Sequence, residues 1–125
     1  MIFHHIGIAC IDIEKEKADI EKLHKVVKKS EVIFDKNQKA SLCLLELEGG
    51  FKIELISGEP VTNILKKNIK YYHLCYEVNN IDESIRDLIK NGAILISDSK
   101  QAEIFNNKKV AFLYVSYGLI ELLEK

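Results

Sequence analysis

The octapeptide FKIELISG, residues 51–58, returns in altered form as GLIELLEK at residues 118–125. Both stretches place Ile-Glu-Leu inside an apolar run that is typical of a buried strand. A carboxylate that is buried without a partner costs several kcal/mol, so Glu54 and Glu121 are each expected to have a cation nearby. The motif therefore predicts a paired carboxylate in each half of the chain.

A second pair of stretches indicates that the whole unit is duplicated. HHIGIACIDIEK, residues 4–15, parallels YHLCYEVNNIDE, residues 72–83. In each, a histidine opens an apolar run, and an Ile-Asp step then leads into a helical pattern. His5 and His73 are 68 residues apart, and the two glutamates of the octapeptides are 67 apart. Two His/Glu pairs with nearly one spacing are most simply explained by two copies of one structural unit.

The hydrophobic patterns predict a strand, a helix and three strands in each half. In the first half we expect strand 2–10, helix 13–28, and strands near 31–34, 40–48 and 51–57. In the second half we expect strand 71–78, helix 81–91, and strands near 94–97, 108–115 and 118–124.

Particular residues support these elements. Asp12 and Asn80 are expected to cap the two helices. The apolar stripes are predicted to lie at Ile13, Ile20, Leu23 and Val27 in the first helix, and at Ile81, Ile85 and Leu88 in the second. Residues 98–109, DSKQAEIFNNKK, are predicted to form an exposed loop, with the border of a cleft as the alternative.

The composition predicts one globular domain over residues 1–125, divided into module 1 (1–57), a linker (58–70) that holds the only proline, and module 2 (71–125). With 47% hydrophobic and 30% charged residues and a net charge of −1, the chain is not expected to bind nucleic acid. No apolar run approaches the roughly 20 residues that span a membrane. Three widely separated cysteines suit core positions in a reducing compartment, so we expect a cytoplasmic protein.

The four repeated polar residues are candidate metal ligands. In a strand, alternate side chains share a face, so Glu121 is expected to point into the interior between Leu119 and Leu123. If the two halves pair their sheets, His5, Glu54, His73 and Glu121 meet. Taken singly, each is more often a core or surface residue, but the matched spacing favours ligands. Two imidazoles and two carboxylates suit one divalent ion: Ni²⁺, Co²⁺, Zn²⁺, Mn²⁺ or Fe²⁺. His4 and His24 are not expected to bind it.

The stretches HHIGIAC, YYHLCYEVNNIDESI and KKVAFLYVSYGLIELLE resemble the vicinal oxygen chelate superfamily, which includes glyoxalases, bleomycin-resistance proteins and dioxygenases. The amino-acid sequence of these stretches is most similar to that of methylmalonyl-CoA epimerase-like and glyoxalase I-like members. The resemblance implies an α+β fold in which two βαβββ modules form an incomplete barrel around a metal site, in a homodimer. The family's ligand positions fall on His5, Glu54, His73 and Glu121.

The resemblance also implies an activity and two departures from the epimerases. It implies a divalent-metal-dependent isomerase or lyase that moves a proton alpha to a carbonyl through a metal-stabilised enolate. Glu121 is the expected base, with Glu54 as the second choice. Similar epimerases commonly carry glutamine at position 54, whereas glutamate resembles glyoxalase I. They also place an acidic residue before the third strand, where Asp35 is the nearest candidate here.

The substrate is expected to be a small molecule, either a methylmalonyl-CoA-like thioester or a glutathione-type hemithioacetal. The alternative is a non-catalytic protein of the same fold that sequesters a small molecule. A dioxygenase is disfavoured, because such members tend toward two histidines and one carboxylate.

Overall fold

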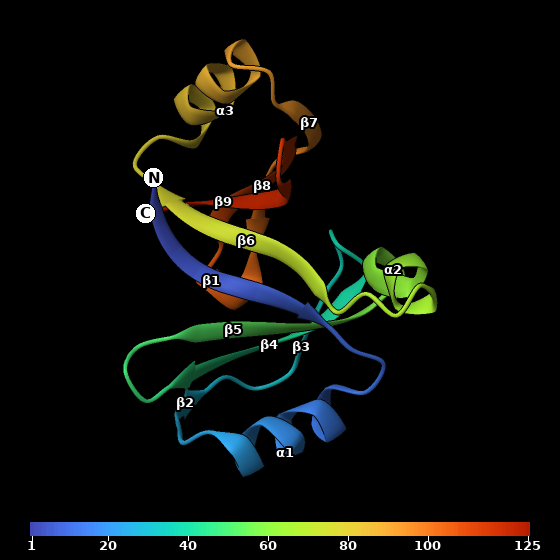
Figure 1. The fold of residues 1–125 in the computed structure, drawn as a ribbon. Helices are drawn as coiled ribbons and strands as arrows, with labels where there is room; N and C mark the ends of the chain where they lie inside the picture. Colours follow the sequence, from blue (N-terminus) through green and yellow to red (C-terminus); the bar gives the residue numbers. More distant parts are fainter. The chain divides into compact units, whose positions relative to one another are not determined.

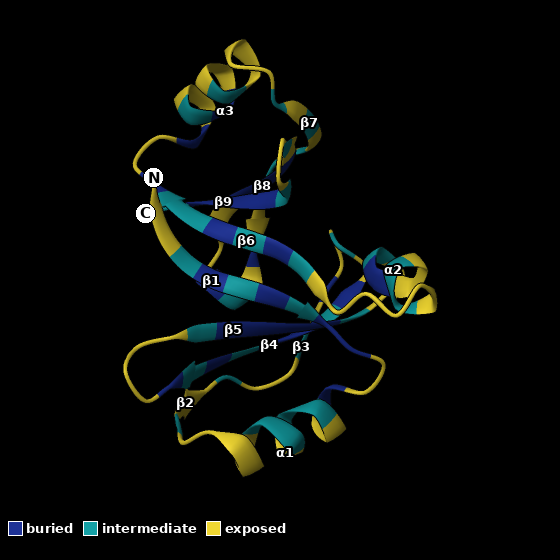
Figure 2. Ribbon diagram, in the orientation of Figure 1, coloured by how far each residue is buried: buried dark blue, intermediate teal, exposed yellow.

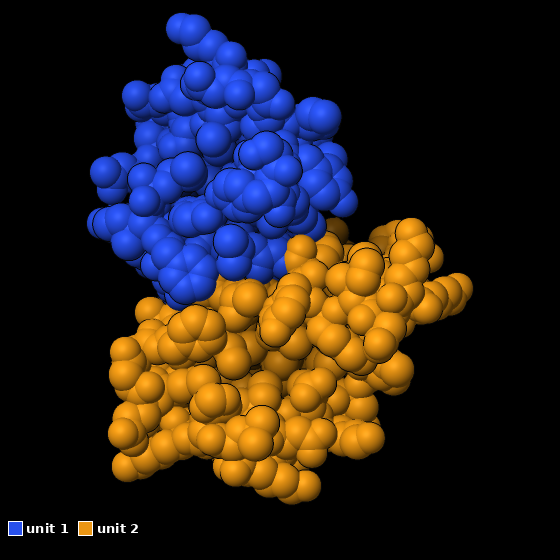
Figure 3. Space-filling model, viewed as in Figure 1, with its two compact units in different colours: residues 1–4, 73–125 blue, residues 5–72 orange.

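The computed structural model describes residues 1–125, which divide into two compact units (Figures 1 and 3). Unit 1 consists of residues 1–4 and 73–125, and unit 2 consists of residues 5–72. Each unit contains a set of paired β-strands with a helix packed against it. None of the helices is long and apolar enough to span a membrane.

The sheet of unit 2 has the strand order β2-β4-β5-β1, with β3 paired to β4. β1 and β5 are parallel, whereas β4 runs antiparallel to β5. Two helices and a 3-10 turn complete the unit. The bounds are β1 Ile2–Ala9, of which residues 2–4 belong to unit 1, α1 Ile13–Leu23, β2 Val26–Lys29, β3 Ile33–Asp35, β4 Ala40–Leu47, β5 Lys52–Gly58, η1 Glu59–Val61 and α2 Thr62–Lys66.

The sheet of unit 1 repeats this plan in the order β6-β9-β8-β7. Here β6 and β9 are parallel, and β8 runs antiparallel to β9. The predicted α+β fold of two βαβββ modules is therefore confirmed. The bounds are β6 Tyr71–Val78, α3 Ile81–Lys90, β7 Ile94–Ala102, η2 Glu103–Phe105, β8 Lys108–Val115 and β9 Gly118–Glu124.

In each unit the core lies between the sheet and its main helix (Figure 2). In unit 2, Ile13 of α1 packs with Leu45, Ile53 and Leu55 of the sheet. The core of unit 1 consists of Val78, Ile81, Ile85, Ala111, Leu113, Ile120 and Leu122. The stripe predicted for α3 is confirmed, since Ile81 and Ile85 are buried and Leu88 packs against them.

The predicted helix caps are confirmed. The carboxylate of Asp12 accepts a hydrogen bond from the backbone N–H of Lys15 at 3.2 Å. The side chain of Asn80 accepts one from the N–H of Glu83 at 3.0 Å. Both contacts satisfy an N–H that has no partner within the helix, so each helix begins where the sequence predicts.

The prediction that the first helix continues to residue 28 is wrong. α1 ends at Leu23 because His24 adopts an extended backbone, and Val26–Lys29 pairs with β4 instead. Leu23 is 79% exposed and Val27 is 52% exposed, so neither belongs to the buried stripe. The β-branched residues Val26 and Val27 favour the strand that they form.

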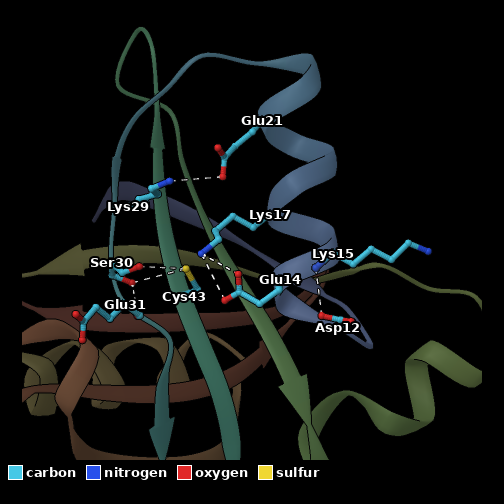
Figure 4. A network of polar contacts seen from close by, with 9 residues as sticks. All are labelled: Asp12, Glu14, Lys15, Lys17, Glu21, Lys29, Ser30, Glu31 and Cys43. Carbon is cyan, nitrogen blue, oxygen red and sulfur yellow. Dashed lines mark hydrogen bonds and ion pairs between the residues drawn. The ribbon is translucent and has the colours of Figure 1, made fainter.

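Polar contacts fasten α1 and β2 to the sheet (Figure 4). Glu21 of α1 lies 3.8 Å from the ammonium of Lys29 on β2. Ser30, directly after β2, donates its backbone N–H to the carbonyl of Leu44 at 2.8 Å, and its hydroxyl accepts the N–H of Leu44 at 2.8 Å. Its carbonyl accepts a weak contact from the thiol of Cys43 at 3.5 Å. These contacts fix the segment that the sequence pattern assigned to a helix.

Two segments that were expected to be irregular contain regular structure. The segment at 58–70 holds η1 and the short helix α2. The predicted loop at 98–109 is mostly strand, because β7 continues to Ala102 and β8 begins at Lys108. The backbone of β7 pairs with β8 as far as Ala102, and this pairing needs no apolar side chains. The division into one domain of two modules and a linker stays a prediction.

Candidate functional site

His5 and Glu54 form a buried pair in unit 2. The Nε2 atom of His5 lies 3.5 Å from Oε1 of Glu54, and the side chains are 0% and 1% exposed. In the parallel pair β1–β5, Gly7 is the partner of Glu54. His5 precedes Gly7 by two residues, so period two places its imidazole on the face that carries the carboxylate.

His73 and Glu121 form the matching pair in unit 1. Nε2 of His73 lies 3.3 Å from Oε1 of Glu121, and the side chains are 1% and 0% exposed. In the parallel pair β6–β9, Cys75 is the partner of Glu121, and His73 precedes it by two residues. The same local geometry therefore occurs twice, as the duplicated sequence predicts.

The alternation of each strand explains why the carboxylates point away from the helices. Ile53 and Leu55 contribute to the core beneath α1, so Glu54 between them lies on the opposite face. Ile120 and Leu122 do the same in unit 1, and they leave Glu121 on the face opposite α3. A charge on either face is costly in this dry environment unless a cation or hydrogen bonds compensate it.

The donor atoms of each pair suit a divalent transition metal. Each histidine offers a ring nitrogen and each glutamate a carboxylate oxygen. Imidazole and carboxylate are ligands of Zn²⁺ and of its first-row neighbours. The two histidines and two glutamates are almost completely buried, which keeps competing water away from their side chains. The residues present therefore fit the kind of metal that the sequence predicts. The assignment of His5, Glu54, His73 and Glu121 to one ion stays a prediction.

The residues beside the two carboxylates differ, and sequence reasoning did not single them out. Gly7 on β1 and Leu44 on β4 flank Glu54. The corresponding neighbours of Glu121 are Cys75 on β6 and Phe112 on β8. The ring of Phe112 also meets His73 edge-on, with 5.5 Å between ring centroids. The signal was available in the repeat, because positions 7 and 75, like 44 and 112, are 68 residues apart.

Asp35 is buried, but its carboxylate is used in a turn. It accepts hydrogen bonds from the backbone N–H groups of Asn37 and Gln38 at 2.8 and 3.2 Å, and from the side-chain amide of Gln38 at 3.3 Å. Ala40 of β4 pairs with Asp35 on one side and with Gly58 of β5 on the other. Gly58 follows Glu54 by four residues on β5. That offset corresponds to roughly 13 Å along a strand. This geometry supports a structural role rather than a second base.

The other two histidines, His4 and His24, make contacts that belong to the fold. His4 meets Phe105 edge-on, with 5.8 Å between ring centroids, and both belong to unit 1. The backbone N–H of His24 ends α1 by donating to the carbonyl of Ile20 at 2.9 Å.

The cysteines are free and buried, as the sequence predicts for core positions. Burial raises the pKa of the Cys10 thiol to about 11, and the nearby carboxylates of Glu16 and Asp12 act in the same direction. Cys10 is therefore a neutral thiol at physiological pH.

Two α+β modules that each carry a buried histidine and glutamate at matched positions define a class of duplicated-module proteins. The sequence profile of one such family matches residues 4–112 of this chain, which is most of its length. The protein belongs to the glyoxalase/bleomycin resistance protein/dioxygenase superfamily.

Solved structures share this fold at low sequence identity. A hypothetical protein of Bacillus halodurans C-125 is 24% identical, with a TM-score of 0.76, and the match covers 98% of this chain and 93% of that one. The methylmalonyl-CoA epimerase of Mycobacterium tuberculosis is 22% identical, with a TM-score of 0.77 and coverage of 98% and 86%. Another methylmalonyl-CoA epimerase is 16% identical, with a TM-score of 0.73 and coverage of 99% and 94%. The comparison with curated proteins found no match.

Proposed function

We propose that the two His–Glu pairs together hold one divalent metal ion, and that the protein is an isomerase or lyase that moves a proton alpha to a carbonyl. The observation that carries this proposal is the repetition of one buried pair, at 3.5 Å in unit 2 and 3.3 Å in unit 1. Burying two carboxylates away from water lowers the stability of the folded protein unless a cation compensates them. A shared cation therefore explains why both carboxylates are present in the same local geometry.

The chemistry needs an electrophile and a base. A bound divalent ion would act as a Lewis acid toward the oxygen of the substrate carbonyl, which makes the neighbouring proton more acidic. A carboxylate within hydrogen-bond reach of that proton can then remove and return it, which contributes about 10²–10⁴-fold to the rate. Glu121 is the proposed base and Glu54 the second candidate, whereas His5 and His73 serve as ligands only.

The proposed substrates are a methylmalonyl-CoA-like thioester or a glutathione-type hemithioacetal. Both carry an acidifiable proton next to a carbonyl or its equivalent. The fold shared with two methylmalonyl-CoA epimerases is compatible with the thioester. We further expect a homodimer in the cytoplasm, and light scattering coupled to gel filtration tests the oligomeric state.

The first test is the metal content of the purified protein, measured by elemental mass spectrometry without chelators. We expect about one transition metal per chain, and loss of most of it in Glu54→Gln and in Glu121→Gln. Glu46→Gln is the matched control, because Glu46 is a half-buried carboxylate on β4 that pairs with Lys52 at 4.0 Å. A protein that takes up no nickel, cobalt, zinc, manganese or iron even on reconstitution would contradict the proposal.

The second test separates an enzyme from a binding protein. The exchange of the alpha proton with deuterated water is followed by NMR for a thioester and for a hemithioacetal. We expect exchange with the wild-type protein and with Glu46→Gln. In Glu121→Gln, exchange should fall at least 100-fold even after residual metal is restored. Binding of metal and ligand without any exchange would instead favour a non-catalytic protein that sequesters a small molecule.

A further inference from the structure

The phenyl ring of Phe112 meets the imidazole of His73 across an intervening strand. The strand order in unit 1 is β6-β9-β8, with His73 on β6 and Phe112 on β8. Neighbouring strands are about 4.8 Å apart, so β6 and β8 are separated by roughly 9.6 Å. The centroids of the two rings are nevertheless only 5.5 Å apart. The two side chains therefore lean toward each other over β9.

Glu121 lies on β9, between the strands that carry these rings. Phe112 is its antiparallel partner on β8, and Nε2 of His73 lies 3.3 Å from its Oε1 atom. The planes of the two rings make an angle of 82°, which is the edge-to-face arrangement that aromatic rings favour. All three side chains are buried. The carboxylate and the two rings therefore form one closely packed cluster.

This packing restricts the rotation of the imidazole. A histidine ring turns about its Cβ–Cγ bond with little intrinsic preference, and the turn exchanges the places of the two sides of the ring. The two ring nitrogens are chemically distinct, so the orientation of the ring decides which one can act as a ligand. A close-packed interior leaves no spare volume for such a rotation. With Phe112 in edge contact, the imidazole of His73 can turn only if the phenyl ring moves as well.

The repeat places leucine at the corresponding position of unit 2. Leu44 is the antiparallel partner of Glu54 on β4, as Phe112 is that of Glu121 on β8. Leu44 is aliphatic and only half-buried. The His–Glu distance is nevertheless similar in the two units, at 3.5 Å and 3.3 Å. An aromatic ring is thus not required to bring a histidine and a glutamate together, and its effect in unit 1 is on the orientation of the imidazole.

We propose that Phe112 is a positioning residue, which holds the imidazole of His73 with Nε2 toward Glu121 and makes the His–Glu pair of unit 1 the more rigid of the two. The consequence for metal binding rests on the proposed function. A ligand that is already oriented loses less conformational freedom when an ion binds, so this rigidity strengthens the binding of the metal.

Phe112→Leu tests the proposal, because it gives unit 1 the residue that the repeat has at position 44. Phe105→Leu is the matched control. Phe105 is 7% exposed, as Phe112 is, and belongs to the same unit. It also meets a histidine edge-on, but this histidine is His4, at 5.8 Å. The two substitutions should therefore cost similar packing energy. Phe112→Met, which keeps more of the volume without a ring, is the second variant if Phe112→Leu does not fold.

NMR of metal-free protein with ¹⁵N-labelled histidines measures the orientation of His73 directly. Long-range correlation spectra distinguish Nδ1 from Nε2 in each imidazole. We expect one set of narrow His73 signals in the wild type and in Phe105→Leu. In Phe112→Leu and Phe112→Met, these signals should broaden at least twofold or split into two sets. Wild-type His73 signals in both Phe112 variants, or equal broadening in Phe105→Leu, would overturn the proposed positioning role.

Calorimetric titration with zinc then measures the consequence for the metal. We expect zinc to bind at least fivefold more weakly to Phe112→Leu than to the wild type, and less than twofold more weakly to Phe105→Leu. Chemical denaturation checks that the two variants have lost similar stability. Broadened His73 signals with unchanged zinc binding would overturn the link between the rigidity of this pair and the binding of the metal.

The metal-free spectra keep this inference distinct from the proposed function. If His73 loses its single orientation in Phe112→Leu but the wild type takes up no metal, the positioning role stands and the proposed function fails. If the wild type holds about one metal per chain but Phe112→Leu behaves as Phe105→Leu does in both measurements, the positioning role fails alone.

Discussion

Glu54 and Glu121 carry the same ligand chemistry, but the residue that faces each across its parallel strand pair is different. Gly7 has no side chain beside Glu54, whereas Cys75 places a buried thiol beside Glu121. Phe112 closes a second side of Glu121. A carboxylate with a glycine neighbour has more room to change its position than one between a thiol and a phenyl ring.

This difference predicts unequal effects of substitution at the two matched positions. Gly7→Val adds volume beside Glu54 and should reduce the metal content at least threefold. Cys75→Ala removes one sulfur atom beside Glu121 and should leave the metal content within about 30% of the wild type. Elemental analysis gives the result, and circular dichroism checks that both variants are folded. A larger metal loss in Cys75→Ala than in Gly7→Val would show that the thiol matters more than the space.

Cys10 provides a test of pH dependence. Its pKa is raised from 9.0 to about 11, so the folded state holds the proton more tightly than the unfolded state does. The resulting stabilisation is fully present below pH 9, and it is lost as the pH rises to about 11. The loss should amount to about 2–3 kcal/mol.

Urea unfolding of wild type and Cys10→Ala at several pH values isolates this contribution from that of other groups. The difference in unfolding free energy between the two proteins should shrink between pH 9 and pH 11. A difference that stays constant over this interval would mean that the Cys10 thiol has the same pKa in both states.

At the scale of elements, substitutions at two glycines with positive φ distinguish the cost of backbone strain from the cost of a steric clash. Gly58 and Gly92 have φ values of +119° and +100°. A Cβ at Gly92 would meet nothing within 4 Å, whereas a Cβ at Gly58 would press on the carbonyl of Lys39 at the β4 side of the sheet. Gly92 follows Asn91, the C-cap of α3, whereas Gly58 is the last residue of β5.

We therefore expect Gly92→Ala to lower the unfolding free energy by about 1 kcal/mol, the ordinary cost of a left-handed alanine. Gly58→Ala should cost about 2–4 kcal/mol, because the neighbouring backbone must also move. Chemical denaturation of the two variants measures both values. Equal costs would indicate that the sheet near Lys39 yields without strain.

The elements that the sequence predicted correctly are those whose signals are local. Asp12 and Asn80 cap their helices because a short polar side chain suits an N-terminus wherever the helix lies. Ile81, Ile85 and Leu88 follow a helical period and do pack into the core. The pairing of each histidine with its glutamate was also predictable, because the spacing of the repeat marks equivalent positions in two copies.

The elements that were missed depend on partners distant in sequence. Val27 could continue a helix or join a strand, and only the register with β4 decides between them. The polar residues of β7 have no hydrophobic pattern, and β8 supplies the pairing that makes them a strand. α2 has five residues, which is too short for a periodic signal, so this helix was not predicted. The repeat marks Gly7 and Cys75 as equivalent positions, but the strand register is needed to place each of them beside a glutamate.

At the scale of the whole molecule, a shared metal ion would stabilise the native protein as a ligand. A ligand present at 100 times its dissociation constant contributes about 2.7 kcal/mol to the unfolding free energy. Under the proposed function, Glu54→Gln and Glu121→Gln should each abolish this gain, because each removes a ligand from a different unit. Hydrogen exchange in both β5 and β9 should slow in wild-type protein when nickel or zinc is added.

Glu46→Gln controls for a general effect of removing a carboxylate and should retain the gain. If only one of the two ligand variants responded, or if exchange slowed in one unit alone, the metal would belong to one pair rather than to both.

Residues 1–4 group with residues 73–125 rather than with the segment that follows them directly. Phe3 meets Tyr76 edge-on, and His4 meets Phe105. During synthesis on the ribosome, residues 5–72 of unit 2 are translated before Tyr76, the residue that Phe3 contacts. The beginning of β1 is thus translated well before the residues of unit 1 that it contacts. A bulky fusion placed directly before Met1 would consequently disturb the contacts of Phe3 and His4 in unit 1 rather than those of residues 5–72.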